Sequence, residues 1–160
     1  EHGMLYAEKG QVPADDTDYY VQYGKARIAR PGRDVTVLTH QMGLAPCLQA
    51  AEDLASEGIE AEVIDLRTVD YQGMDYATIV ASVRKTGAAL TVEQAERSLS
   101  LGARLADELA LRCFDYLDAP VTHVTSPDAP LVVSRPIEAA MLPSLEGIRD
   151  AMRRAALRQV

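Results

Sequence analysis

The sequence lacks the features that would assign it to several large classes of protein. Among its 160 residues, no apolar run approaches the roughly 20 residues that a membrane-spanning helix requires. Lys and Arg number 16 against 24 Asp and Glu, so the net charge is −8. Because such a chain has no basic field to attract phosphates, we predict no nucleic-acid partner and no binding to a membrane.

Cysteine is scarce as well. Cys47 and Cys113 fall in separate helical patterns, which excludes a disulfide framework. Free cysteines are typical of a reducing compartment, and we predict a cytoplasmic location. Because free Cys is among the most buried residue types, we expect both side chains in the core.

Standard catalytic signatures are also missing. The sequence contains no G-x-G-x-x-G, no G-x-x-x-x-G-K and no G-x-S-x-G. Its three histidines are scattered, without the spacing of metal ligands. The residues alone therefore identify no active site.

What the sequence does contain is an alternation of short β-branched runs with amphipathic segments. Strands are predicted at residues 35–39, 60–66, 88–94 and 121–126. Helices are predicted at residues 44–58, 75–87, 100–117 and 144–157. This alternation predicts an α/β fold with a mostly parallel sheet and helices packed on it. It leaves the direction of the last strand open.

The first 24 residues differ from the rest. They show no sustained period, and they contain Gly, Pro and clustered Asp, which is typical of loops. Five acidic residues and one Lys give this segment a net charge of −4. We interpret residues 1–24 as the end of a preceding domain and a linker, and residues 25–160 as the α/β domain.

Three polar residues lie at the carboxyl ends of predicted strands. In open α/β sheets, ligands bind beyond the carboxyl ends of the strands, where His40, Arg67 and Glu93 are expected. Such a trio could form a general-base or small-ligand site. The alternative, which we prefer because no spacing fixes their geometry, is that they satisfy loop backbone or contact an adjoining domain.

The stretch FDYLDAP, residues 114–120, places two acids at the end of a predicted helix. The helix macrodipole disfavours a carboxylate there by about 0.3–1 kcal/mol, and no cation lies between Asp115 and Asp118. Asp118 either caps the turn before Pro120 or is kept for a basic partner.

Several stretches together carry a family resemblance. In order along the chain they are EHGMLYAEKGQVP, EVIDLRT, SVRKTG, TVEQ, LDAPVTHVTSPDAP and LPSLEGI. The sequence resembles, over nearly its whole length, the C-terminal half of the beta subunit of thiamine-diphosphate-dependent 2-oxo acid dehydrogenases. These are the decarboxylase components of the pyruvate, branched-chain and acetoin dehydrogenase complexes.

The resemblance implies a transketolase-type C-terminal domain: three layers, about five mostly parallel strands and helices on both faces. It implies a parent oxidoreductase that decarboxylates pyruvate or a related 2-oxo acid and transfers the acyl group to lipoyl groups. That parent uses thiamine diphosphate and magnesium. None of the family's catalytic elements maps onto this chain, so we expect it to be inactive alone and to bind no cofactor.

The resemblance also implies partners. They are the alpha subunit, a second beta subunit in a two-fold dimer, and the subunit-binding domain of the dihydrolipoamide acyltransferase. The docking position of the family maps onto Asp118 and, more loosely, onto the terminal carboxylate of Val160. The alternative function is a free-standing flavodoxin-like module that binds a small ligand or nucleotide at His40, Arg67 and Glu93.

Overall fold

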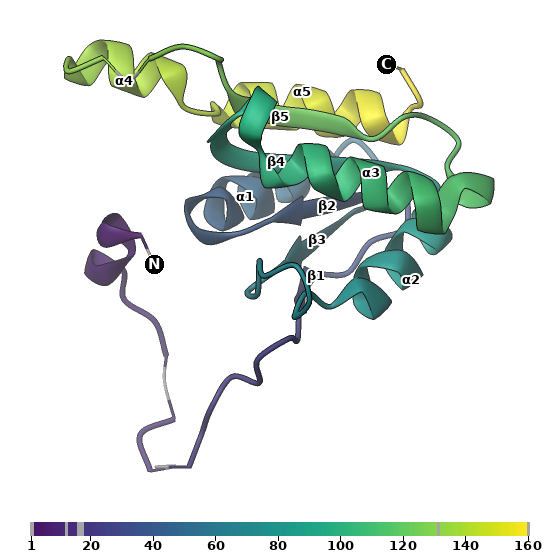
Figure 1. The fold of residues 1–160 in the computed structure, drawn as a ribbon, viewed down its shortest axis with the longest axis horizontal. Helices are drawn as coiled ribbons and strands as arrows, with labels where there is room; N and C mark the ends of the chain where they lie inside the picture. Colours follow the sequence, from purple (N-terminus) through teal and green to yellow (C-terminus); the bar gives the residue numbers. More distant parts are fainter. Residues whose placement is uncertain (1, 12, 16–17, 131, 160) are drawn as a thin grey trace.

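The computed structural model describes residues 2–11, 13–15, 18–130 and 132–159. The described parts of the segment before residue 25 run outside the layered domain and contain one short 3-10 helix, η1 (Gly3–Ala7) (Figure 1). None of these residues is buried. The boundary at residue 24 stays a prediction.

The domain is built on one five-stranded sheet. Its strands are β1 (Arg27–Arg30), β2 (Val35–Thr39), β3 (Ala61–Asp65), β4 (Ala89–Glu96) and β5 (Thr122–Ser126), in the order β1-β3-β2-β4-β5. β2 runs parallel to both β3 and β4, and β5 runs parallel to β4. Only β1 is antiparallel, at the edge beside β3. The predicted mostly parallel sheet is confirmed, and the last strand proves to be parallel.

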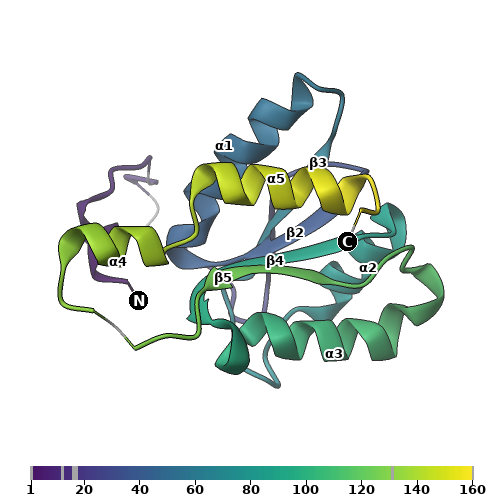
Figure 2. The same ribbon diagram turned by 90° about the horizontal axis from the view of Figure 1, so that it is seen from above.

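Helices cover both faces of this sheet (Figure 2). The long helices are α1 (Leu44–Ala55), α2 (Tyr76–Thr86), α3 (Leu101–Cys113) and α5 (Leu145–Ala156). α1 and α5 pack on one face, and α2 and α3 on the other. The short α4 (Arg135–Met141) has no buried residue and projects from the layers. None of the helices in the described part of the chain is long and apolar enough to cross a membrane.

The core consists of two clusters, one under each helix layer. Successive residues of β2 point to opposite faces, so Val35 and Val37 join one cluster while Leu38 joins the other. Cys47 lies in the first cluster and Cys113 in the second, both buried and unpaired, as expected. Burial raises the pKa of the Cys47 thiol to about 12, which makes it an inert core group.

The predicted helix over residues 100–117 is too long. α3 ends at Cys113, and a 3-10 turn, η4 (Phe114–Tyr116), follows it. Asp118 therefore lies beyond the helix and not in its last turn. The reason is that the chain must turn there to bring the backbone N–H of Asp118 to the carbonyl of Gly87, at 2.8 Å.

The Arg158 side chain connects three segments at the end of the sheet where β2 begins. Its guanidinium donates to the backbone carbonyls of Asp34 at 2.9 Å, Thr86 at 2.7 Å and Ala156 at 2.6 Å. These carbonyls come from the start of β2 and the ends of α2 and α5. One charged side chain thus satisfies backbone groups from elements on both faces of the sheet.

We predict that Arg158→Met destabilises the domain by about 1–3 kcal/mol, because three backbone carbonyls lose a charged donor. The matched control is Arg154→Met. Arg154 is exposed, and its side chain has no hydrogen bond or ion pair within the described residues. Urea unfolding of both variants checks this, and equal effects of the two changes would contradict it.

Candidate functional site

The carboxyl ends of β2 and β4 bring two of the three predicted residues together. Glu93, in β4, is 5% exposed, and its carboxylate lies 4.0 Å from Nε2 of His40, which follows β2. The same carboxylate accepts the backbone N–H of Leu101 at 3.1 Å and that of Gly102 at 2.6 Å. Glu93 therefore binds the first turn of α3, where the helix presents unpaired N–H groups.

Gly102 makes this close approach possible. A Cβ at this position would lie 2.3 Å from Oγ1 of Thr91 and 2.7 Å from Oε1 of Glu93. Any other residue would push α3 away from β4. Glycine is therefore required at this position by the buried carboxylate beside it. The sequence signal for this contact is a Glu on a strand followed nine residues later by a Gly in a helix start.

The carboxylate of Glu93 is held in its charged form. Burial by itself raises its pKa, but the His40 imidazole and the two backbone N–H groups outweigh burial, so the pKa is lowered. A general base near neutral pH needs a pKa close to the working pH. Glu93 is thus arranged as a structural anion, which agrees with the preferred reading of the sequence.

Arg67 stands apart from this pair. Its backbone is left-handed, with φ of 55°, and its Nε lies 3.6 Å from Oδ2 of Asp65. Within the described residues, Arg67 makes no hydrogen bond or ion pair with His40 or Glu93. In the structure, His40 and Glu93 therefore lie close together, whereas Arg67 pairs with its neighbour Asp65.

Asp118 also has a partner within the chain. Its Oδ2 lies 3.0 Å from Nη2 and 3.3 Å from Nε of Arg158, which is 40 residues away in sequence. Gly87 is adjacent, in the left-handed region at φ of 71°, and a Cβ there would lie 2.3 Å from Oδ2 of Asp118. The acid is thus part of a packed corner, although its side chain remains 60% exposed.

An apolar hollow of about 630 Å³ adjoins Asp118, and the sequence did not reveal it. It is lined by Ala106, Ala110, Phe114, Leu117, Asp118, Ala119, Pro120 and Val121. Phe114 is 78% exposed at its wall. An exposed apolar patch of this kind often marks a surface that binds another protein. Val160, the other predicted docking residue, lies outside the described residues.

We predict that Glu93→Gln lowers stability at neutral pH by about 1–3 kcal/mol, because a neutral amide replaces the carboxylate that accepts two buried N–H groups. The pKa of a Glu in an unfolded chain is about 4.3. The pKa of Glu93 in the folded state is lower than this value. Its stabilisation is therefore present above pH 4.3 and is lost as the pH falls through the folded-state pKa.

Thermal melts of wild type and Glu93→Gln across acidic pH measure this difference. The control is Glu96→Gln, an exposed carboxylate at the end of the same strand. A melting difference that does not shrink on acidification would show that the charge of Glu93 is not what stabilises the fold.

Comparisons with known proteins agree with this architecture. Residues 24–148 match the family model "Transketolase, C-terminal domain". The chain is 37% identical, over 96% of its length, to pyruvate dehydrogenase E1 component subunit beta of Rhizobium meliloti (strain 1021), and spans 33% of that protein. It is 39% identical, over 99% of its length, to the mitochondrial subunit beta-1 of Arabidopsis thaliana, and spans 44% of it.

A solved structure gives the same result. The chain superimposes on a split-gene transketolase, described as an inactive beta4 tetramer, with a TM-score of 0.74 and 25% identity. The match covers 94% of this chain and 47% of that one, so the chain spans less than half the length of each relative described here. The resemblance read from the sequence is confirmed, and the flavodoxin-like alternative is not favoured. The chain belongs to the family of transketolase C-terminal domains, and its curated relatives include pyruvate dehydrogenase beta subunits.

Proposed function

We propose that the chain is the C-terminal assembly and docking domain of a pyruvate dehydrogenase-type beta subunit. The parent enzyme would oxidatively decarboxylate pyruvate or a related 2-oxo acid and pass the acyl group to lipoyl groups. The observation that carries the proposal is the 37–39% identity, along nearly the whole chain, to subunits of that name. Location in the cytoplasm stays a prediction, because the named relatives include mitochondrial proteins.

The candidate residues suit assembly better than chemistry. Glu93 binds the start of α3, and Arg67 binds Asp65, so both strand-end charges have local partners. Among the described residues no cluster of His, Cys, Asp or Glu could hold a metal ion. The family resemblance assigns magnesium and thiamine diphosphate to other parts of the parent enzyme, and we keep that assignment as part of the proposal.

Docking of the acyltransferase's subunit-binding domain is proposed at Asp118 and the adjoining hollow. Arg158 occupies Oδ2 of Asp118, whereas Oδ1 accepts no hydrogen bond within the described residues. A basic partner could therefore add to the existing pair without displacing Arg158, while an apolar side chain entered the hollow beside Phe114.

The alpha subunit and a second beta subunit complete the proposed assembly. Support for pairing between beta chains comes from the split-gene transketolase, whose description is of an inactive tetramer of beta chains. Closed two-fold pairs are the commonest symmetry of homo-oligomers. Sedimentation of the 160-residue chain at high concentration tests the pairing.

We predict that Asp118→Asn weakens binding of the acyltransferase subunit-binding domain by about 2–5 kcal/mol, because one charge-assisted contact is lost from the interface. The free domain should lose less than about 1 kcal/mol, since the Asp118–Arg158 pair is exposed. Titrations at two salt concentrations, alongside thermal melts, measure both effects.

The control for this change is Asp115→Asn, an exposed acid in the preceding turn. It should leave affinity unchanged. Unchanged affinity for Asp118→Asn together with a clearly lowered melting temperature would make Asp118 a structural cap only.

We predict that the purified chain alone shows no thiamine-diphosphate-dependent decarboxylation of pyruvate or other 2-oxo acids. The reason is that the two candidate carboxylates are already engaged, Glu93 with the first turn of α3 and Asp118 with Arg158. Steady-state assays with added cofactor and magnesium measure this. Saturable turnover, or tight nucleotide binding near His40, would contradict the proposed function and revive the ligand-binding alternative.

A further inference from the structure

The outer edge of β5 is unpaired. β5 bonds to β4 on one side only, and no other strand among the described residues lies on its other side. Residues 122–125 are partly exposed, whereas every residue of the central strand β2 is buried. An exposed edge strand presents a row of free N–H and C=O groups to which another extended chain can pair.

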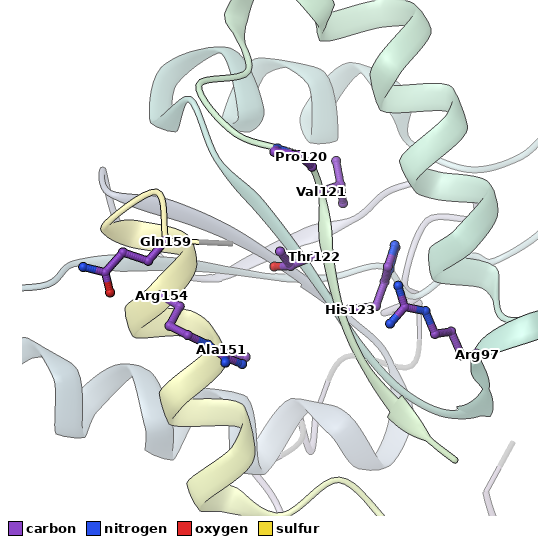
Figure 3. A pocket seen from close by; sticks show the side chains of 8 residues that line it. All are labelled: Arg97, Pro120, Val121, Thr122, His123, Ala151, Arg154 and Gln159. Carbon is purple, nitrogen blue, oxygen red and sulfur yellow. The ribbon is translucent and has the colours of Figure 1, made fainter. Parts of the chain in front are cut away.

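A cavity of about 350 Å³ lies along this edge. Its walls are residues 120–123, together with Arg97 from the 3-10 turn η3 (Arg97–Leu99) and Ala151, Arg154 and Gln159 from α5 and the residues after it. In Figure 3, Arg97 and His123 lie on one side of β5, while Arg154 and Gln159 lie on the other. The cavity therefore meets polar side chains from both faces of the sheet.

Among the described residues that line this cavity are two arginines and no Asp or Glu, in a chain whose net charge is −8. The guanidinium groups of Arg97 and Arg154 are exposed, and neither makes a hydrogen bond or ion pair within the described residues. Asp128 is near Arg97, which contributes, after the N–H of Ser98, to lowering its pKa. His123 is already fixed by a 2.7 Å hydrogen bond to Oγ1 of Thr91.

We propose that the outer edge of β5 binds an extended, acidic segment of a partner polypeptide by strand addition. Neighbouring side chains of an added strand point to opposite faces of the sheet. One acid would then meet Arg97 and the next would meet Arg154. The partner is thus a β-forming segment with two adjacent acidic residues, which is chemically distinct from the basic partner proposed for Asp118.

Two other occupants fit less well. A second copy paired through β5 would bring the arginines of both copies close to one pair of strands, and the close approach of like charges at an interface is unfavourable. A single small anion would have to contact guanidinium groups that approach β5 from opposite sides (Figure 3). Two acids on one extended chain match this arrangement directly.

The test uses the 160-residue chain and a fluorescent ten-residue peptide of alternating Thr and Val with Asp-Glu at its centre. Saturable binding is expected, and the double change Arg97→Gln and Arg154→Gln should weaken it by roughly tenfold and reduce its salt dependence. The control is Arg27→Gln, an exposed arginine on β1 at the opposite edge of the sheet. It should leave affinity unchanged.

Two peptide controls separate charge from strand pairing. A peptide with Asn-Gln in place of Asp-Glu should bind more weakly, and one with Pro beside the acids should bind little, because it lacks a backbone donor. On labelled wild-type protein, the largest amide shifts should fall on residues 121–126. Absence of saturable binding, shifts elsewhere, or loss of self-association in the double variant would overturn the proposal, the last by giving the edge to a second copy.

Discussion

The constraint on which the structure depends is that both faces of a mostly parallel sheet must be covered. β2 is buried on both sides, so its even and odd positions both carry apolar or hydrogen-bonded side chains, and helices have to return across each face in turn. Because helices cover both faces of the sheet, its faces are not available for binding. The ends of the strands and the two edges of the sheet remain accessible.

The strand ends are only partly available. At the carboxyl end, Glu93 holds the first turn of α3 against β4, which anchors the helix that covers one face. At the opposite end, Arg158 donates to the carbonyl of Asp34, just before β2, and to those of the last residues of α2 and α5, and its remaining hydrogen bonds reach Asp118. The charged groups at both ends of the strands thus bind backbone groups of the packed helices. This distribution agrees with the proposed role as an assembly domain rather than a catalytic one.

The local sequence pattern predicted the elements whose apolar spacing is set by burial against the core. The β-branched run at residues 35–39 and the spacing of apolar residues in α3 predicted those elements, because burial on one or two faces dictates them. β1 was missed, since Arg27-Ile28-Ala29-Arg30 has one large apolar residue and its strand identity comes from pairing with β3. The end of α3 was also misplaced, because the chain turns there to form a hydrogen bond between Asp118 and the distant Gly87.

The candidate site shows the same division. His40 and Glu93 were expected near each other, because the carboxyl ends of parallel strands lie at the same end of the sheet, and the structure places the two side chains 4.0 Å apart. The partner of Asp118 could not be found, because Arg158 is 40 residues away and reaches it only through the closure of α5 over the sheet. The arginines beside β5 could not be found from the sequence either, since only the fold brings Arg97 and Arg154 to the two sides of this strand.

These two surfaces lie close together along the chain, and their opposite signs constrain how a partner can approach. Asp118 and its apolar hollow precede β5, while the arginines flank the strand itself. A basic partner is attracted to the first surface and repelled by the second, and the reverse holds for an acidic segment. Residues 120 and 121 line both cavities, so two partners would also compete for space there. In the proposed assembly, charge would direct each partner to its own side of this short segment, and steric overlap would decide whether both bind at once.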